Sequence, residues 1–430
     1  MEIYRINGGV RLEGRTRAKG AKNAVLPIMA ASLMCRGECV IHNCPDLSDV
    51  RVMMKILESY GCSCSLHENT LVIDPARAGS GGCAPELMSR LRSSVFLMGP
   101  VTAAFGSFES SRPGGCAIGR RPVDFHLYAM RSLGASAEEN EDGIRCEVRS
   151  SGRRLKGADI VFPRVSVGAT ENAMMAACLA DGVTRIKNAA REPEIMQLQD
   201  FLNAAGGRVS GAGTSVITVE GVERLHPAEF TIMSDRIETG TIIAAAAATG
   251  GNVLIERAPA AYIKSVVGIF EAAGCSFRYD SGSGGLEVRA PRRLKGAGRV
   301  ETEPYPGFPT DMQSQLMAAM IGADGETVIR ENIFEDRFTA AGELRKTGAL
   351  IYVGSGGCEA VVRGVSGHTG ARMRAQDLRG GAGLVIAALS AHGTSVIENV
   401  CYIDRGYDKL EVILHELGAE IYRVEEEVNG

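Results

Sequence analysis

The segment RPGGCAIGRRPVDFH, residues 112–126, surrounds one cysteine with glycines and cations. Cys116 follows Arg112 and precedes Arg120 and Arg121. Positive neighbours lower the pKa of a thiol below its reference of about 8.5, and this increases the reactive thiolate fraction. Glycine-rich segments of this kind are typical of exposed loops rather than of packed cores. We therefore expect Cys116 to be a reactive thiol, the alternative being an inert surface cysteine.

A lysine at the start of an apolar run is a second candidate. In GAKNAVLP, residues 20–27, Lys22 and Asn23 stand where a helix is expected to begin. The N-terminus of a helix carries partial positive charge and unpaired N–H groups, so an ammonium group there completes an anion site. The alternative is a solvated Lys22 with Asn23 as the helix cap.

A third candidate is the Pro-rich segment EPYPGFPTDMQSQ, residues 303–315, which brings Thr310 and Asp311 to the start of a helix. An aspartate in this place is either a helix cap or a general base. The two roles do not exclude each other, so both interpretations of Asp311 stay open.

Two arginines lie in segments that open later helices, Arg379 in QDLRGGAG and Arg405 in YIDRGYDKL. Aspartates precede both, so surface ion pairs with Asp377 and Asp404 are one interpretation. Exposed pairs contribute only about 0 to 1 kcal/mol to stability, so stability alone is a weak reason for this arrangement.

The whole chain has a globular composition without a strong overall charge. Its 430 residues hold 47 Lys and Arg against 51 Asp and Glu, a formal net charge of -4. No global basic field is present to hold nucleic acid or an anionic membrane, so we expect neither as a partner. The longest apolar stretches are shorter than the about 20 residues of a spanning helix, and the N-terminus lacks the layout of a signal peptide. We expect a cytoplasmic protein.

The 12 cysteines are scattered along the chain, and most lie beside apolar residues. This is typical of small buried side chains in a reducing compartment. Cys62 and Cys64 form only a CxC pattern, and no set of Cys and His residues completes four metal ligands. The sequence therefore predicts no metal site and no cofactor.

A repeat of about 70 residues runs through the chain. Helix-like segments end at a glycine turn six times, with successive turns 68 to 74 residues apart, and a short alternating segment follows each turn. A glycine in this place supplies the left-handed conformation that ends a helix, and alternation predicts a strand. The six turn glycines are Gly61, Gly134, Gly206, Gly274, Gly348 and Gly418.

The first half of each repeat is an Ala-rich helix, a glycine and a strand. The strands of four repeats end at Asn43, Asn188, Arg257 and Asn399. The second helix is amphipathic, as in residues 50–57 and 410–417, so the predicted unit is helix, strand, helix, strand. Six such units divide naturally into two domains of three. Because ligands favour domain interfaces, we expect the active site in the cleft between the domains.

Eight motifs carry a specific resemblance over essentially the full length: GAKNA, PGGCAIGRRPVDFH, SVGATEN, NAAREPEI, DRIETGT, FPTDMQ, DLRGGAGLVIAAL and IDRGYD. In this order they resemble the sugar-nucleotide members of the enolpyruvyl transferase family. The resemblance implies a two-domain α/β fold of the inside-out barrel type, with six βαβαββ-type repeats, three in each domain. It implies one domain from residue 22 to 233 and a second that combines residues 1–21 with residues 234–430.

The activity implied by the resemblance is transfer of the enolpyruvyl group of phosphoenolpyruvate to the 3'-hydroxyl of UDP-N-acetylglucosamine, with release of phosphate, as the first committed step of peptidoglycan synthesis. Addition requires a proton delivered to the methylene carbon of phosphoenolpyruvate and another removed from the hydroxyl, and elimination reverses this proton traffic. A strongly anionic donor also needs several fixed cations. We expect these two small molecules as the only partners of a monomer or weak oligomer.

The resemblance also implies roles for residues at matching positions. Cys116 is implied as the general acid that also forms a covalent adduct with phosphoenolpyruvate, and Asp311 as the base at the sugar hydroxyl. The implied phosphoenolpyruvate site consists of Lys22, Asn23, Arg121, Arg337, Arg379 and Arg405, of which Lys22 and Arg405 are also implied as catalytic. The implied UDP-N-acetylglucosamine site consists of Asn23, Arg92, Arg121, Pro122, Val123, Asp124, Phe125, His126, Arg164, Ser166, Val167, Gly168, Asp311 and Ile333.

The chain departs from the family pattern at Arg164, because members of the family often carry Lys before VSVGAT. The positive charge is kept, but the point-charge geometry of an ammonium group is not. Two rivals are disfavoured. The Gly-Asn-Ala-Gly-Thr and Lys-Ser motifs of the shikimate-pathway branch have no match here, and a binding-only relative is expected to lose Cys116, Lys22 or Asp311, which are all present.

Overall fold

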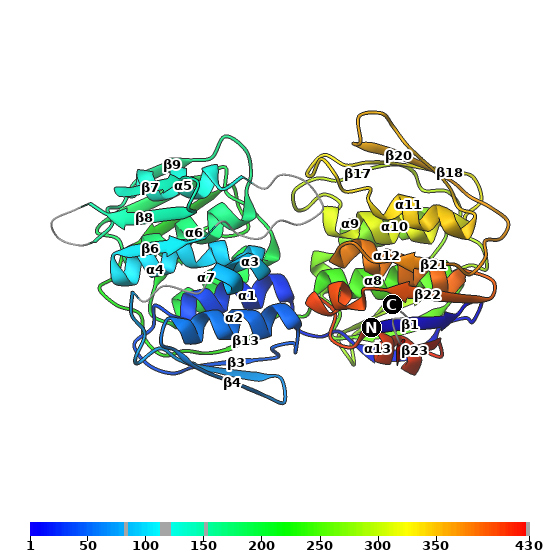
Figure 1. The fold of residues 1–430 in the computed structure, drawn as a ribbon, viewed down its shortest axis with the longest axis horizontal. Coiled ribbons are helices and arrows are strands. Elements are labelled where there is room, and N and C mark those ends of the chain that lie inside the picture. Colours follow the sequence, from blue (N-terminus) through cyan, green and yellow to red (C-terminus); the bar gives the residue numbers. More distant parts are fainter. Residues whose placement is uncertain (81–84, 112–121, 150–153, 427–430) are drawn as a thin grey trace. The chain divides into compact units, whose positions relative to one another are not determined.

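The computed structural model describes residues 1–80, 85–111, 122–149 and 154–426 (Figure 1). The chain forms two compact units. Unit 1 combines Met1–Lys19 with the chain from Ser234 onward, and unit 2 runs from Gly20 to Met233. Every helix within the described ranges is too short or too polar to cross a lipid bilayer.

Unit 2 contains three small sheets, and β13 from the end of the unit completes the sheet of the first repeat. Its elements are α1 (Lys22–Ser32), β3 (Cys39–His42), α2 (Ser48–Ser59), β4 (Ser63–His67), β5 (Thr70–Asp74), α3 (Pro85–Arg90), η1 (Arg92–Leu97), α4 (Met98–Phe105), β6 (Ser107–Ser110), α5 (Asp124–Ser132), β7 (Ala135–Glu139), β8 (Ile144–Val148), β9 (Asp159–Val161), α6 (Val167–Cys178), β10 (Val183–Lys187), α7 (Pro193–Ala204), β11 (Arg208–Ser210), β12 (Val216–Glu220) and β13 (Glu229–Thr231). The sheet orders are β13-β3-β5-β4, β6-β8-β7 and β11-β12-β10-β9.

Unit 1 repeats the same plan with three four-stranded sheets. Its elements are β1 (Glu2–Asn7), β2 (Glu13–Arg17), α8 (Arg236–Ala248), β14 (Asn252–Glu256), η2 (Ala260–Tyr262), α9 (Lys264–Ala272), β15 (Ser276–Asp280), β16 (Gly285–Arg289), β17 (Gly298–Glu301), η3 (Thr310–Met312), α10 (Gln313–Ala319), η4 (Met320–Gly322), β18 (Glu326–Arg330), α11 (Ala340–Leu344), η5 (Arg345–Thr347), β19 (Leu350–Val353), β20 (Glu359–Arg363), β21 (Arg372–Arg374), α12 (Leu378–Ser390), β22 (Thr394–Glu398), η6 (Val400–Arg405), α13 (Leu410–Glu416) and β23 (Glu420–Glu425). The sheet orders are β21-β22-β1-β23, β15-β16-β14-β2 and β17-β18-β20-β19.

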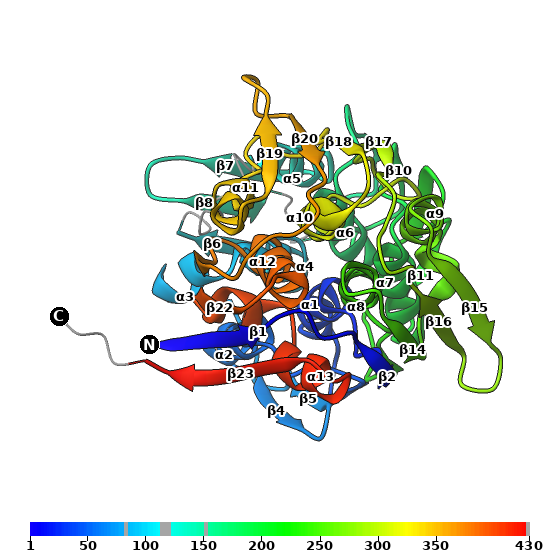
Figure 2. The same ribbon diagram turned by 90° about the vertical axis from the view of Figure 1, so that its right-hand side faces the viewer.

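The first helix of each repeat in unit 1 lies in the interior. Helices α8, α10 and α12 pack against one another, and Figure 2 shows the three sheets of the unit arranged around them. Nearly every residue of α8 and α12 is buried, and their Ala and Gly residues allow close approach. At Gly383 on α12, a Cβ would lie only 2.8 Å from the carbonyl oxygen of Ser314 on α10. This arrangement, with helices inside and sheets outside, is the one that the family resemblance implies.

Left-handed residues end the second helix and the preceding strand of the repeats. The six turn glycines have φ between 89° and 104°. Asn43, Asn188, Arg257 and Asn399, which directly follow strands, have φ between 54° and 59°. The prediction that a left-handed glycine ends each second helix is confirmed.

The unit deduced from the residues alone has too few strands. A hairpin follows five of the six glycine turns, for example β15 and β16, where the residues indicated a single strand, whereas β23 after Gly418 pairs with the N-terminal strand β1. The first hairpin strand carries little apolar signal because it is mostly exposed, and β4 has no fully buried residue. Each four-stranded sheet also contains a parallel strand, such as β17 beside β18. The N-terminal strands β1 and β2 complete two sheets of unit 1.

Candidate functional site

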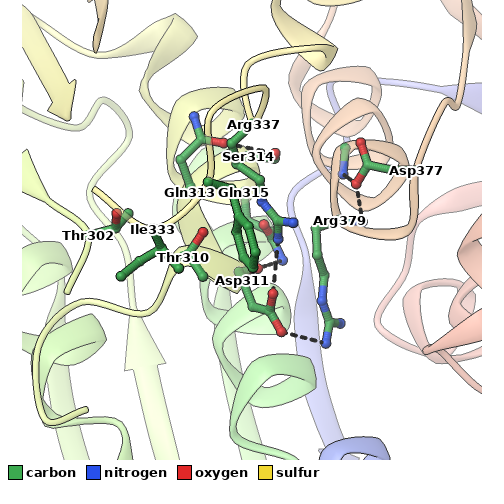
Figure 3. A network of polar contacts seen from close by, with 12 residues as sticks. Thr302, Thr310, Asp311, Gln313, Ser314, Gln315, Ile333, Arg337, Asp377 and Arg379 are labelled. Carbon is green, nitrogen blue, oxygen red and sulfur yellow. Dashed lines mark hydrogen bonds and ion pairs between the residues drawn. The ribbon is translucent and has the colours of Figure 1, made fainter. Parts of the chain in front are cut away.

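Asp311 lies between two buried arginines of unit 1 (Figure 3). Arg337 donates from Nη2 to Asp311 Oδ1 over 2.9 Å, and Arg379 donates from Nη2 to Oδ2 over 3.2 Å. The two arginine side chains are 3% and 4% exposed, whereas the Asp311 side chain is 26% exposed. One carboxylate thus faces two guanidinium groups, and this local excess of positive charge favours a further anion.

Both guanidinium groups keep a buried N–H that has no hydrogen-bond partner within the described part of the chain. The nitrogen atoms are Arg337 Nε and Arg379 Nη1. A buried donor without an acceptor costs free energy, so an oxygen that accepts from it stabilises the site. Phosphate and carboxylate oxygens are the acceptors that guanidinium groups bind most strongly.

A polar network supports Arg379 from within unit 1. The guanidinium carbon of Arg379 lies 5.4 Å from the ring centroid of Tyr407, whose hydroxyl is 2.8 Å from Thr241 Oγ1. Gln315 Nε2 donates to both of these hydroxyls over 3.2 Å and to the Asp311 carbonyl over 2.8 Å. Burial by itself lowers the pKa of Arg379, but Tyr407 and Asp311 raise this pKa above its ordinary value. Arg379 is therefore a permanent cation.

Two alternatives from the sequence are wrong. Asp311 is not a helix cap, because Pro309 is the N-cap of η3 and Asp311 is the second residue of that turn. Arg379 is buried against Asp311 rather than paired with Asp377 at the surface. Asp377 instead caps α12 and accepts from the backbone N–H of Arg379 over 3.0 Å. Arg405, the last residue of η6, is half-buried.

Lys22 is the first residue of α1, in unit 2. Its Nζ lies 2.6 Å from Asp49 Oδ2 on α2, and the two side chains are 9% and 5% exposed. The N-cap of α1 is Ala21, which provides no side-chain acceptor, and Asn23 lies inside the helix and is half-buried. The alternative of a solvated Lys22 capped by Asn23 is therefore wrong. The buried ammonium group stands at the positive end of a helix dipole, as an anion site requires.

Residues 122–126 of the expected UDP-N-acetylglucosamine site lie at the start of α5. Phe125 is half-buried, and its ring centroid is 6.1 Å from that of Phe162 and 6.0 Å from the guanidinium carbon of Arg164. Of the neighbouring residues, Pro122 and Asp124 are exposed and Val123 is buried. An aromatic face beside an exposed guanidinium group can hold a planar, anionic ligand.

Residues 166–168 of the expected UDP-N-acetylglucosamine site form the start of α6. Ser166 is the N-cap and accepts from Ala169 N over 3.4 Å, and Val167 is the first helical residue. A Cβ on Gly168 would lie 3.0 Å from His126 Cε1. The absence of a side chain at Gly168 thus lets the start of α6 approach the His126 ring closely. A helix N-terminus with small residues is a favourable approach for a phosphate group.

Two polar residues that contact expected site residues were not predicted from the sequence. Asn172 on α6 has its Nδ2 2.9 Å from His126 Nδ1, and its Oδ1 accepts from Gly99 N over 2.6 Å. Asp49 is the partner of Lys22. The available signal was a polar residue on a buried face, since Asn172 interrupts an Ala- and Met-rich helix and Asp49 precedes the apolar Val50.

Several expected site residues lie outside the described residues. They are Cys116 and Arg121, together with the side chain of Arg92. Ile333 is described, and it is 39% exposed. Among the described residues no group of His, Cys, Asp and Glu side chains is arranged to hold a metal ion.

Comparisons of the sequence identify relatives along the whole chain. The family described as EPSP synthase (3-phosphoshikimate 1-carboxyvinyltransferase) matches residues 6–427. UDP-N-acetylglucosamine 1-carboxyvinyltransferase 1 of Symbiobacterium thermophilum is 47% identical over 428 residues, which cover 98% of this chain and 95% of that protein. UDP-N-acetylglucosamine 1-carboxyvinyltransferase 2 of Caldanaerobacter subterraneus subsp. tengcongensis is 45% identical over 424 residues, or 99% of this chain and 100% of that protein.

Solved structures share the fold. The enolpyruvyl transferase NikO of Streptomyces tendae superposes with a TM-score of 0.83 at 24% identity and covers 98% of this chain and 99% of its own. EPSP synthase of Acinetobacter baumannii has a TM-score of 0.72 at 16% identity and covers 99% and 100% of the two chains. The predicted enolpyruvyl transferase-like α/β fold is confirmed.

Proposed function

Because the chain belongs to the EPSP synthase family of carboxyvinyltransferases, we propose that it transfers the enolpyruvyl group of phosphoenolpyruvate to the 3'-hydroxyl of UDP-N-acetylglucosamine. The hydroxyl oxygen adds to C2 of phosphoenolpyruvate, while the hydroxyl loses its proton and C3 gains one. Phosphate then leaves C2 and C3 gives up a proton, which restores the double bond. This reaction is the first committed step of peptidoglycan synthesis.

The observation that carries the proposal within the structure is the pair of buried arginines on Asp311. Two guanidinium groups with unpartnered N–H donors suit a small molecule that carries both phosphate and carboxylate. Asp311 is the proposed base at the sugar hydroxyl, since its carboxylate is the more exposed part of this cluster. Fixed cations in a buried site also stabilise charge that develops on the leaving phosphate.

The remaining phosphoenolpyruvate contacts are proposed from both the structure and the family resemblance. The buried Lys22 ammonium group is a further cation for the donor. Arg405 at the end of η6 and Asn23 in the first turn of α1 are both half-buried, and both are proposed contacts of phosphoenolpyruvate. Arg121 is proposed as a contact from the family resemblance alone. Cys116 is proposed on the family resemblance as the general acid for C3 and the site of the covalent adduct, and the arginines that flank it in the sequence favour its reactive thiolate.

The UDP-N-acetylglucosamine site is proposed along the starts of α5 and α6 in unit 2. Phe125 supports the uracil ring, and the start of α6 at Ser166, Val167 and Gly168 is proposed to bind the diphosphate. Arg164 keeps the positive charge of the family's lysine and is exposed enough to reach a phosphate. Further proposed contacts are Asn23, Arg92, Arg121, Pro122, Val123, Asp124, Val167, Asp311 and Ile333.

The proposed setting is the cytoplasm, with the chain acting as a monomer or weak oligomer. Both substrates carry several negative charges, and charged molecules do not cross a bilayer unaided. Size-exclusion chromatography with light scattering measures the oligomeric state.

A phosphate-release assay tests the function. The chain is incubated with phosphoenolpyruvate and either UDP-N-acetylglucosamine or shikimate 3-phosphate. We expect phosphate release only with the sugar nucleotide, together with a product that keeps the three-carbon unit, as read by mass spectrometry. Turnover with shikimate 3-phosphate alone would instead assign the acceptor of the sister branch of the family.

A further inference from the structure

A buried glutamate directly after β18 collects four hydrogen bonds. Glu331 is 2% exposed. Its Oε1 accepts from Thr302 Oγ1 over 2.9 Å, from Ile333 N over 2.9 Å and from Phe334 N over 3.1 Å. Its Oε2 accepts from Thr310 Oγ1 over 3.0 Å. One carboxylate therefore joins the ends of three chain segments that are separate in sequence.

The repeat makes Glu331 unusual at this position. In three other repeats the residue directly after the corresponding strand is an asparagine with positive φ, whose amide donates to a backbone carbonyl beside the neighbouring parallel strand. The donor and acceptor pairs are Asn43 and Ile232, Asn188 and Phe162, and Asn399 and Ala375. Glu331 does not share the left-handed conformation. A local departure from a repeated pattern indicates a specific role.

The partner position has changed together with it. Thr302 is the residue directly after the parallel strand β17. The equivalent residues after β13, β9 and β21 are Ile232, Phe162 and Ala375. At the position after the parallel strand, an apolar residue whose carbonyl accepts is thus replaced by Thr302, whose hydroxyl donates. At the position after the central strand, the donating asparagine amide is replaced by the accepting carboxylate of Glu331. The exchange reverses the direction of the bond. It also leaves the second carboxylate oxygen free to accept a hydrogen bond from the Thr310 hydroxyl. An asparagine has an amide nitrogen in place of this oxygen, and that nitrogen can only donate.

The segments joined by Glu331 carry two proposed contacts of the acceptor sugar. Thr310 precedes Asp311, the proposed base, and Ile333 is a proposed sugar contact. Figure 3 shows Thr302, Thr310 and Ile333 on one side of Asp311, with Arg379 on the other side. The arginines thus hold the Asp311 carboxylate, while Glu331 holds the preceding residue and the Ile333 backbone.

We propose that Glu331 is a positioning residue for the acceptor, which sets the place of Asp311 relative to Ile333 through its bonds to Thr310 and to the Ile333 N–H. The inference rests on the proposed function, because it concerns the acceptor of that reaction. A shift of about 1 Å at a reacting group can reduce turnover by up to about a hundredfold, so even one lost bond is expected to be measurable.

Kinetics of Thr310 variants test this role without emptying the carboxylate site. Thr310→Val removes the hydroxyl that donates a hydrogen bond to Glu331 Oε2, whereas Thr310→Ser keeps a hydroxyl at this position. Glu326→Gln on the same strand is the matched control, because Glu326 lies at the surface and pairs with Arg363. Steady-state phosphate release gives kcat and the KM of each substrate, and thermal unfolding checks that every variant is folded.

We expect Thr310→Val to lower kcat/KM for UDP-N-acetylglucosamine about tenfold, with the KM of phosphoenolpyruvate changed less than about twofold. Thr310→Ser and Glu326→Gln are expected to stay within about twofold of the unchanged chain. Unaltered kinetics of Thr310→Val, or an equal loss toward both substrates, would overturn the positioning role. A wild-type chain without turnover on the sugar nucleotide would overturn the proposed function, and the acceptor role with it.

Discussion

The Nζ of Lys22 lies 2.6 Å from Asp49 Oδ2, and both side chains are at least nine-tenths buried. The pair joins the first residue of α1 to the first turn of α2 within unit 2. A buried pair of this kind stabilises mainly because neither charge is left alone. Lys22 therefore has two separable roles, one in the proposed binding of phosphoenolpyruvate and one in compensating Asp49.

Replacing Lys22 is expected to affect turnover and stability together. Lys22→Ala should abolish phosphate release, and it should lower the free energy of unfolding by about 3 kcal/mol because the Asp49 charge loses its close cation. The double variant Lys22→Met/Asp49→Leu should recover most of the stability but none of the turnover. Urea unfolding and phosphate release measure the two effects. Near-normal phosphate release by Lys22→Ala would remove Lys22 from the reaction.

Cys116 is expected to react with the epoxide antibiotic fosfomycin. Its neighbouring arginines favour the thiolate, which opens the epoxide by forming a C–S bond while the C–O bond breaks and the oxygen takes up a proton. Intact-protein mass spectrometry should show a gain of one fosfomycin, faster with UDP-N-acetylglucosamine present. Cys116→Ser should show no gain. A gain that persists in Cys116→Ser would assign the alkylation to another residue.

The repeat could be predicted because its signals are local. Gly274 ends a helix and begins a strand within a few residues, and the structure gives it φ of 104°. Strands such as β4 could not be predicted, since their exposed residues carry no apolar alternation. Asp311 and Arg379 could each be predicted from their own segments and the family motifs, but their mutual ion pair joins positions 68 residues apart. Spacing along the chain contains no signal for such a contact.

The same limit applies to residues that the sequence analysis missed. Glu331 and its partner Thr302 are 29 positions apart, and nothing local distinguishes Glu331 from a surface glutamate. Only its burial and the comparison of equivalent positions across the repeats distinguish Glu331 from a surface glutamate. Asn172 is more accessible to such reasoning, because a lone amide within an Ala- and Met-rich helix needs buried partners.

Gly168 tests the proposed sugar-nucleotide site. A Cβ there would lie 3.0 Å from His126 Cε1 and 3.2 Å from Phe96 Cε1, so Gly168→Ala must displace these rings. We expect a stability loss of about 1 to 2 kcal/mol and a rise of about tenfold in the KM of UDP-N-acetylglucosamine, with a smaller change for phosphoenolpyruvate. Gly342→Ala is the control, because a Cβ at Gly342 meets nothing within 4 Å. That variant should be active and equally or more stable.

Glu238 makes the stability of the chain depend on pH. It is 3% exposed in the first turn of α8 and accepts from Lys19 N over 3.0 Å. Burial, and then the negative charges of Asp235 and Asp408, raise the pKa of Glu238 from 4.5 to about 7, while Lys19 acts in the opposite direction. The folded chain therefore keeps a proton that the unfolded chain has lost between about pH 4.5 and 7. Stability from this group falls as pH rises through that window, and is constant above it.

Glu238→Gln removes this titration but keeps an oxygen that can accept from Lys19 N. We compare the free energy of unfolding of Glu238→Gln with that of the unchanged chain. Between about pH 5 and about pH 8, this difference should shift by about 2 kcal/mol in favour of the variant. Urea unfolding of both proteins at the two pH values measures the change. A difference between Glu238→Gln and the unchanged chain that is the same at both pH values would mean that Glu238 has an ordinary pKa in the folded protein.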